Sequence, residues 1–321
     1  MNQSPYRKEW LVGTSIARGF MGMSTGERIP TISGYSESFS CSRGIVQNAL
    51  NFLEKEGAVV LDKQGKKGTF LLEKNDHLLI KYSGLTHLTA SMPPPINSHF
   101  AGLATGICQG MSRSEVPFTF AFVHGAKARM DALARGSYDF IIATEHAAKN
   151  YVEKHPEVDI AFSLKESVYS LPYKLYINKP GKTAIEDGMT LAVDPYSYDQ
   201  VTITGKVCEG KDVLIKEMPV ISTIYAFFSG SVDAIVFRDS IDNRNQQLLN
   251  SVLKMDMIVS AKEVSEIELD IKENDEMSVP VVMVNRENYG IADILRNYLD
   301  GNLVGYIQSQ VVGGQMAPRF Y

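Results

Sequence analysis

Three polar residues at four-residue spacing have side chains that could read DNA. Arg43, Gln47 and Asn51 would share one face of a helix over residues 42–54. Guanidinium and amide groups match the donors and acceptors of base edges in a major groove. The opposite face carries an apolar stripe formed by Val46, Ala49, Leu50 and Leu53. The pattern predicts a recognition helix, and its alternative is an amphipathic helix whose polar face is only solvated.

A lysine-rich turn follows this helix directly. Two short β-prone runs, residues 58–61 and 69–72, flank a glycine-containing turn with Lys63, Lys66 and Lys67. A hairpin after an amphipathic helix is typical of a winged helix, whose tip lies along phosphates or in a minor groove. A lysine-rich turn alone is usually only solvated, but its place after the polar helix face favours a contact with DNA.

Residues across this region resemble the GntR-type winged-helix signature. They run without a gap from about residue 10 to 72 and comprise Gly26-Glu27-Arg28-Ile29-Pro30-Thr31, Ser42-Arg43, Ala49-Leu50, Leu53-Glu54, Glu56-Gly57 and Gly68-Thr69-Phe70. The resemblance implies that the DNA contacts are Arg28, Ser42, Arg43, Gly44, Gln47, Lys66, Lys67, Gly68 and Thr69. Ile32, Tyr35 and Ser40 depart from the family pattern, and the Ser- and Gly-rich segment 31–39 is a weak positioning helix.

The charge distribution separates this small module from a larger body. Residues 1–75 hold 10 Lys and Arg against 7 Asp and Glu, whereas residues 76–321 hold 22 against 30. A basic end on an acidic body is expected where one module meets phosphate and the other does not. We therefore predict a DNA-binding domain over residues 1–75 and a second domain over residues 76–321.

Composition limits the class of protein further. Cys41, Cys108 and Cys208 form no CxxC pair, so we expect neither a disulfide scaffold nor a zinc module. The most apolar stretch, residues 221–237, is interrupted by polar residues and is too short for a membrane span. The N-terminal residues lack the apolar run of an export signal. We expect a cytoplasmic protein without a membrane partner.

Residues 76–321 alternate between β-type and helical patterns, which predicts an α/β fold with parallel sheets and helices on both faces. The expected strands are 85–91, 118–123, 138–143, 171–177, 190–193, 232–237 and 279–284, and the expected helices are 96–111 and 126–135. Two segments, at Gly136 and Gly230, both read Gly-Ser-x-Asp between a helix end and a buried strand. The echo favours two similar lobes, although this motif is also a common helix-to-strand turn.

This body resembles the type 2 periplasmic-binding-protein fold. The whole order, a GntR-like winged helix followed by such a body, is similar to the YhfZ-type regulators. The resemblance implies two lobes with a small-molecule effector bound between them. Lobe one would comprise about 80–170 and 258–321, and lobe two about 171–257. The chain would cross between the lobes at Leu171–Ile177 and at Asp256–Ser260.

Polar residues at the carboxyl ends of the expected strands form the candidate effector site. Ligands of open α/β sheets bind beyond these ends, where helix N-termini attract anions, so we expect an anionic effector. The candidates are Ser91, His124, Thr144, Glu145, Asp194, Ser197 and Arg238. Arg238 could clamp a carboxylate or phosphate, and its alternative is an ion pair with Asp239 or another acid. Thr144 and Ser197 could equally be helix caps.

The sequence carries no recognisable catalytic motif. The histidines form no HExxH or paired metal spacing, and no GxSxG, P-loop or GxGxxG motif stands in the required context. We therefore expect no catalytic residue, metal or cofactor, and predict a homodimeric, effector-responsive regulator that reads an inverted repeat in double-stranded DNA. The alternatives are a lyase or transferase with a winged-helix appendage, and a body that no longer binds a ligand. The stripe Leu295, Leu299, Leu303 and Ile307 fits either a dimer surface or a core.

Overall fold

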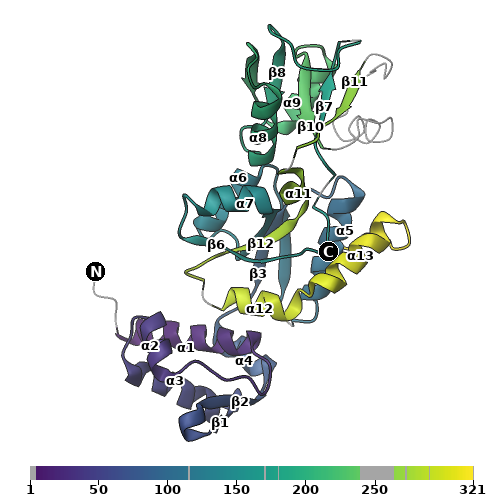
Figure 1. Cartoon of the computed structure of the whole chain (residues 1–321). Helices are drawn as coiled ribbons and strands as arrows, with labels where there is room; N and C mark the ends of the chain where they lie inside the picture. Colours follow the sequence, from purple (N-terminus) through teal and green to yellow (C-terminus); the bar gives the residue numbers. More distant parts are fainter. Residues whose placement is uncertain are drawn as a thin grey trace.

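The structure, a computed structural model, describes residues 5–114, 116–169, 171–179, 181–238, 264–271, 273–288 and 290–320. Three bodies follow one another along its length (Figure 1): a small helical body with a hairpin, a first α/β lobe and a second α/β lobe. The chain enters the second lobe and then returns to the first. The first lobe is therefore built from two separate stretches of sequence.

The N-terminal body is a winged helix. It consists of α1 (Pro5–Gly22), α2 (Ile32–Ser38), α3 (Arg43–Lys55), β1 (Val59–Lys63), β2 (Thr69–Lys74) and α4 (Asp76–Ser83). The predicted recognition helix and hairpin are confirmed, because the apolar stripe of α3 is buried and β1 pairs with β2 in antiparallel fashion. Helices α1 and α4 were not expected from the sequence. Since α4 packs on α1, this body continues past residue 75 to Ser83.

The first lobe is built on a five-stranded sheet with the strand order β4-β3-β5-β12-β6. Its strands are β3 (Leu88–Met92), β4 (Phe118–Phe122), β5 (Phe140–Thr144), β6 (Val158–Ser163) and β12 (Pro280–Asn285), and its helices are α5 (Ser98–Met111), α6 (Ala126–Ala134), α7 (Glu145–Val152), α12 (Ile291–Tyr298) and α13 (Gly301–Val312). Alternate residues of β5 enter two cores. Phe140 and Ile142 belong to the core of α5 and α12, whereas Ile141 and Ala143 belong to that of α6 and α7.

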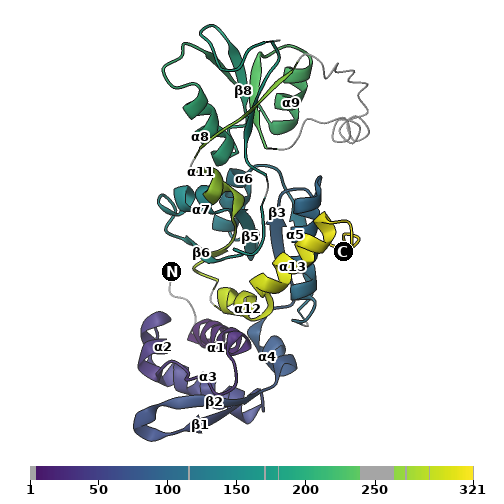
Figure 2. The ribbon, with the colours of Figure 1, turned by 45° about the vertical axis from the view of Figure 1, so that its right-hand side comes forward.

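The second lobe repeats this arrangement. Its strands are β7 (Lys174–Ile177), β8 (Thr190–Val193), β9 (Leu214–Glu217), β10 (Ala234–Phe237) and β11 (Ser265–Glu268), and its helices are α8 (Tyr198–Val207) and α9 (Val220–Phe228). In the order β11-β7-β10-β8-β9, the first strand of the β-α-β-α-β unit lies between the other two, as in the first lobe. Figure 2 shows the two sheets stacked above the winged helix.

The two Gly-Ser-x-Asp turns make equivalent hydrogen bonds in the two lobes. The first glycine of each motif is left-handed, with φ of 74° and 73°. The Asp139 carboxylate accepts hydrogen bonds from the backbone N–H (2.8 Å) and the hydroxyl (3.1 Å) of Thr89 in β3. Asp233 likewise accepts the backbone N–H of Thr190 in β8 (2.8 Å). The echo in the sequence therefore reflects two equivalent lobes.

Two features of the sheets differ from the expectation. The sheets are mixed rather than parallel, because β7 and β12, which follow the two crossings, enter antiparallel to their neighbours. The predicted return to lobe one at residue 258 is too early, since β11 still pairs with β7 and only then does α11 (Glu273–Ser278) lead into β12. Strand β11 was missed because its four residues, SEIE, are too few for a periodic signal. The predicted crossing at Asp256–Ser260 lies outside the described residues.

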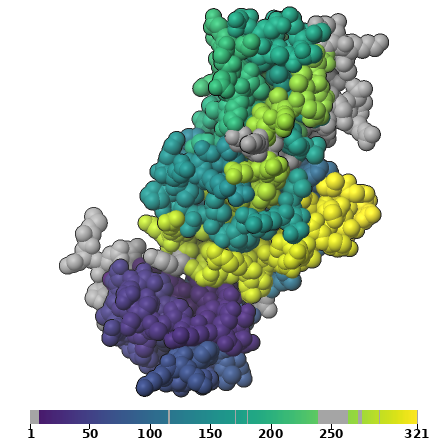
Figure 3. Space-filling model, viewed as in Figure 1, coloured from purple at the N-terminus to yellow at the C-terminus, as the bar shows by residue number. Residues whose placement is uncertain are grey.

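The winged helix is attached to the first lobe by direct helix packing (Figure 3). Helix α1 lies so close to α12 that a Cβ on Gly22 would come within 2.3 Å of the Cβ of Asp293. The Arg18 guanidinium donates to the side chain of Asn288 (2.8 Å), and Asn288 donates in turn to Asp139 (3.0 Å). One apolar core runs from α1 and α3 into β3, α5 and α12. The winged helix and the first lobe therefore share a core.

The leucine stripe at residues 295–307 belongs to the core. Leu295, Leu299 and Ile307 are at most 3% exposed. Helix α13 packs on α5, where Gly102 and Gly106 would bring a Cβ within about 3 Å of the α13 backbone. Small residues at this contact let the two helices approach closely. Core packing is therefore confirmed for Leu295, Leu299 and Ile307, whereas Leu303 is only half-buried.

Replacing Gly22 by alanine is expected to weaken the contact between α1 and α12, because the new methyl group would overlap Asp293. We expect a loss of about 1–3 kcal/mol in the free energy of unfolding, measured by urea denaturation. Gly19→Ala is the matched control in the same helix, since nothing lies within 4 Å of its Cβ position. It should be neutral or stabilise the protein by up to about 1 kcal/mol. Equal effects of the two substitutions would contradict the close packing.

Candidate nucleic-acid interface and ligand cleft

Helix α3 lies at the end of the molecule far from the second lobe (Figure 1). The Ser42 hydroxyl caps the helix by accepting a backbone N–H of its first turn (3.4 Å). Arg43, Gly44 and Asn51 are exposed, and the half-buried Gln47 donates from its amide to Asn51 (2.9 Å). The residues predicted to contact DNA from this helix thus lie on one accessible face.

The wing carries exposed cations beside this face. Lys66 and Lys67 lie in a short turn at the hairpin tip, and both are exposed. Arg28 pairs with β2 through a backbone bridge, and its guanidinium lies against Gly68, where a Cβ would come within 2.4 Å of Nε. The φ of Gly68 is +103°, a left-handed conformation that favours glycine at this position. The structure therefore brings Arg28 to the wing lysines.

Helix α3 and the wing are held in a fixed relation. An ion pair between Glu54 and Lys63 (2.9 Å) joins the end of α3 to β1. A groove between α2, α3 and the hairpin is lined by Thr31, Gln47 and Thr69, among other residues. The helix and the hairpin therefore form two walls of one groove, which polar and apolar side chains line together.

The departures from the GntR pattern leave the positioning helix intact. Helix α2 forms despite its weak propensity, because the Thr31 hydroxyl caps it by accepting the N–H of Gly34 (3.0 Å). Tyr35 is buried and stacks on Phe39. Ser40 stands where glycine is usual, and its φ of +46° is left-handed. The cost of that conformation falls on the turn before α3 and does not displace the helix.

A cleft lies between the two lobes at the carboxyl ends of their parallel strands, as expected from the sequence. Its volume is about 110 Å³. It is lined by Pro93, Pro94, Ile96, Phe100, His124, Gly125, Ala126 and Arg129 of the first lobe, by Tyr169 and Tyr173 of the first crossing, and by Asp194, Ser197, Asp199, Gln200, Val220, Phe237 and Arg238 of the second lobe. Four of the predicted effector residues, His124, Asp194, Ser197 and Arg238, are among them.

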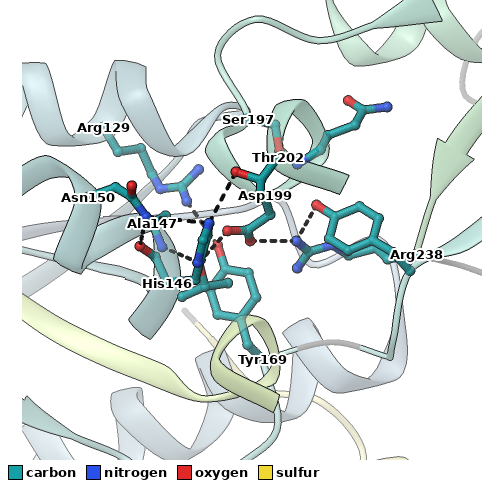
Figure 4. A network of polar contacts seen from close by, with 12 residues as sticks. Arg129, His146, Ala147, Asn150, Tyr169, Ser197, Asp199, Thr202 and Arg238 are labelled. Atoms are coloured by element: carbon teal, nitrogen blue, oxygen red, sulfur yellow. Dashed lines mark hydrogen bonds and ion pairs between the residues drawn. The ribbon is translucent and has the colours of Figure 1, made fainter. Parts of the chain in front are cut away.

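Arg238 is already engaged by neighbouring groups (Figure 4). Its guanidinium donates to the Asp199 carboxylate (2.8 Å) and to the Tyr173 hydroxyl, and it lies over the rings of Tyr173 and Tyr169 at 4.3 and 5.4 Å. Burial lowers the pKa of Arg238, but Tyr173 and Asp199 outweigh it and hold that pKa above its ordinary value. Burial raises the pKa of Tyr173 to about 12. The expected ion pair exists, with Asp199 as its partner; Asp239 lies outside the described residues.

Arg129 is the second cation of the cleft and is only 1% exposed. It donates to the Val123 carbonyl (2.7 Å) and to the Tyr169 hydroxyl (2.9 Å). Its buried Nε has no hydrogen-bond partner in the described part of the chain. Partial burial and Arg129 lower the pKa of His124, and Asp194 opposes them. His124 is therefore mainly neutral at pH 7.

Side chains and backbone of the two lobes meet across the cleft. The Thr144 hydroxyl donates to Asp199 (3.0 Å), and the same oxygen caps α7 by accepting a backbone N–H (3.1 Å). The His146 ring lies 3.2 Å from the Thr202 hydroxyl. The backbone N–H of Lys127 donates to a carbonyl in the loop after β8 (3.0 Å). Thr144 is thus both a helix cap and a contact between lobes, and the structure shows the lobes closed on each other.

Three predicted effector residues, Ser91, Thr144 and Glu145, are not among those that line the cleft. Ser91 is fully buried within β3, and Glu145 pairs with Lys149 one turn along α7 (3.1 Å). Arg129 and Asp199 were not predicted from the sequence, because they come from helices rather than from loops. The available signal was their position, since each lies in the first turn of a helix that follows a strand of the parallel unit.

Four charged side chains, Arg129, Asp194, Asp199 and Arg238, line the cleft. Within the described ranges, no group of three or more His, Cys, Asp or Glu residues is placed to hold a metal ion. Across the same ranges, no helix combines the length and apolar character that a bilayer crossing needs. The cysteines are free thiols, and burial raises the pKa of Cys108 to about 12.

The fold and the cleft define a winged helix joined to a two-lobed body of the periplasmic-binding-protein type. Residues 75–320 match the family described as the YhfZ C-terminal domain, and residues 24–71 match a helix-turn-helix domain. The chain belongs to the YhfZ family. The resemblance to the YhfZ-type regulators inferred from the sequence is confirmed, as is the predicted α/β fold.

A relative in sequence spans the whole chain, and two solved structures cover about three quarters of it. The uncharacterized protein YhfZ of Escherichia coli K12 is 24% identical over 320 residues and covers 100% of both chains. The crystal structure of YhfZ from Shigella flexneri matches with a TM-score of 0.60 at 21% identity, over 76% of this chain and 97% of that one. The periplasmic VFT2 domain of Bordetella pertussis BvgS matches with a TM-score of 0.48 at 12% identity, over 73% of this chain and 96% of its own.

Replacing Asp199 by asparagine is expected to destabilise the protein, because it removes the carboxylate charge that pairs with the buried Arg238 guanidinium at 2.8 Å. Breaking one side of a buried ion pair costs about 3–5 kcal/mol, measurable as a loss in the free energy of unfolding in urea. Glu186→Gln is the control, since it breaks an exposed ion pair with Lys182 (2.7 Å) and should cost less than about 1 kcal/mol. A similarly small effect for Asp199→Asn would mean that Arg238 is compensated by other groups.

Proposed function

We propose that this chain is a DNA-binding transcriptional regulator whose two-lobed body binds a small-molecule effector. The observation that carries the proposal is the accessible polar face of α3 beside the lysines of the wing, on a chain that is otherwise acidic. Such a face suits a major groove, and such a wing suits phosphates. The helix-turn-helix match and the family of the body support this division of work.

The proposal includes a homodimer that acts in the cytoplasm. A single winged helix covers a short stretch of DNA, whereas two copies related by a twofold axis read the two halves of an inverted repeat. Linking two half-sites in this way raises affinity without any new contact, because the second copy binds at high effective concentration. A protein that binds chromosomal DNA must act in the compartment that contains the DNA, which in bacteria is the cytoplasm.

The effector would act through closure of the two lobes. A ligand shifts such an equilibrium only by its different affinity for the open and closed states. The contact between Thr144 and Asp199 spans the lobes, so separation of the lobes would break it. A ligand that touches both walls of the cleft adds to this contact. The first lobe carries the winged helix with it, since Arg18 and the packing of α1 on α12 join the two.

We further propose that the cleft binds without catalysing a reaction. Asp199 accepts hydrogen bonds from both Thr144 and Arg238, so its carboxylate is already engaged. The pKa of Tyr173, about 12, is far from the value that suits a general acid or base at neutral pH. These properties favour a recognition site over an active site.

Arg43→Ala is expected to weaken operator binding by about 1–3 kcal/mol and to relax base preference at one position of each half-site, because a guanidinium contacts a base edge from α3. The operator is first selected from random duplexes with the purified full chain, and affinity is then measured by titration. Arg135→Ala, which removes an exposed arginine of the first lobe, is the control and should bind as the wild type does. Unchanged affinity and preference in Arg43→Ala would show that α3 does not read bases.

Lys66→Ala is expected to act differently, because the wing lysine contacts phosphate and not bases. Binding should weaken on all sequences alike, and the slope of the logarithm of affinity against the logarithm of salt concentration should fall by about 1. Lys211→Ala, an exposed lysine of the second lobe, provides the matched loss of charge and should leave the slope unchanged. The same slope in both variants would place the wing away from the DNA.

A further inference from the structure

Four charged side chains line the cleft, but they form only one ion pair among the described residues. Arg238 and Asp199 neutralise each other at 2.8 Å. Arg129 and Asp194 are only 1% and 4% exposed, and neither has an oppositely charged side chain within ion-pair distance in the described part of the chain. A buried charge without a partner is unfavourable by several kcal/mol. Each of these two groups is therefore suited to meet a charge on a ligand.

The positive end of the cleft lies at the start of α6. Arg129 belongs to the first turn of this helix, and its Nε is buried without a partner in the described residues. The helix begins after Gly125 without a side-chain cap, and Gly125 and Ala126 both line the cleft. The N-terminus of a helix and a guanidinium both favour an anion, and a planar guanidinium suits a carboxylate. This end of the cleft suits a carboxylate group.

The negative end lies opposite, on the second lobe. Asp194 follows β8, and one oxygen of its carboxylate accepts the backbone N–H of Tyr196 (2.9 Å). That bond fixes the side chain but leaves its negative charge uncompensated. His124 feels both ends, since Arg129 adds to the effect of burial in lowering its pKa and Asp194 raises it. The two unpaired charges therefore both act on His124, which lines the same cleft.

We propose that the effector is a compact zwitterion, with a carboxylate bound at Arg129 and the start of α6 and an ammonium group bound at Asp194. The inference rests on the proposed function, in which this cleft is the effector site. Since the charges that line the cleft sum to zero, a zwitterion pairs both free groups without adding net charge. A phosphate or dicarboxylate would pair Arg129 but would leave Asp194 as a buried, repelling charge. The expected ligand is thus narrower than the anion predicted from the sequence.

The remaining walls set the size and character of the ligand. Pro93, Ile96 and Phe100 of the first lobe face the cleft together with Val220 and Phe237 of the second. The volume of about 110 Å³ is well below the range of roughly 300–1,000 Å³ of pockets for drug-sized ligands. A small molecule with a short aliphatic side chain, such as an aliphatic α-amino acid, is compatible with this volume and these apolar lining residues. Because Arg129 and Asp194 belong to different lobes, the ligand would favour the closed form.

Calorimetric titration of the full chain with the common L-α-amino acids tests the inference. For the tightest-binding amino acid, two derivatives separate the two ends of the site. The N-acetyl derivative lacks the ammonium charge, and the decarboxylated amine lacks the carboxylate. We expect each derivative to bind at least about 10-fold more weakly than the parent, which corresponds to about 1.4 kcal/mol.

A variant isolates the negative end. Asp194→Asn keeps an oxygen for the N–H of Tyr196 and removes only the charge. It should weaken binding of the amino acid about 10-fold or more and leave binding of the N-acetyl derivative unchanged. Asp187→Asn is the matched control, because Asp187 precedes β8 and likewise accepts a backbone N–H, that of Asp212 (2.9 Å). It should bind as the wild type does.

The opposite results overturn the inference. These are equal affinity for the amino acid and its N-acetyl derivative, unchanged affinity in Asp194→Asn, or no binding of any amino acid, with or without binding of inorganic phosphate or succinate. Operator affinity measured with and without each probe separates this inference from the regulator itself. An amino acid that binds as expected but leaves operator affinity unchanged contradicts only the regulator. Phosphate that binds and changes operator affinity contradicts only the zwitterion.

Discussion

The carboxylate of Asp199 is the point on which the closed arrangement of the two lobes depends. One oxygen accepts the hydroxyl of Thr144 from the first lobe, and the other accepts the guanidinium of Arg238 from its own lobe. Asp199 lies in the first turn of α8, where the helix dipole favours a negative charge. Since Thr144 also caps α7, the same contact joins the first turns of two helices that face each other across the cleft.

Because Arg238 is paired with Asp199, the charge available to recognise an anionic group of a ligand is that of Arg129. A paired and stacked guanidinium supports the walls of the cleft, together with Tyr169 and Tyr173, and contributes little net charge. Arg129 has only uncharged partners among the described residues. The arginine predicted from the sequence, Arg238, lies at a strand end of the second lobe, whereas the arginine with an unbalanced charge, Arg129, lies near the start of α6 in the first lobe. Only the packing of Tyr169 and Val123 around it reveals the difference.

The parts of the fold that follow from local patterns were predictable from the sequence. The stripe of α3, the glycine-bearing wing and the run Thr190–Val193 each contain their own periodicity or turn signal, and the repeated Gly-Ser-x-Asp motif correctly indicated two similar lobes. Elements that are stabilised by contacts with residues distant in the sequence were not predictable. Strand β11 is stabilised by its hydrogen bonds to β7, at the edge of the sheet. The eight-residue helix α4 is stabilised by its packing against α1. The pairing of Arg238 with Asp199 joins residues 39 positions apart and has no sequence signature.

The shared core of the winged helix and the first lobe constrains how a ligand could regulate DNA binding. Helix α1 is fixed to α12 by the close approach at Gly22 and by the bonds of Arg18 and Asn288, so closure of the cleft leaves the winged helix in place relative to the first lobe. What closure changes is the position of the second lobe. If two copies met only through their first lobes or winged helices, the spacing of the two recognition helices would not respond to a ligand. The proposed regulation therefore requires that the second lobe, or the crossing segments beside it, take part in the contact between copies.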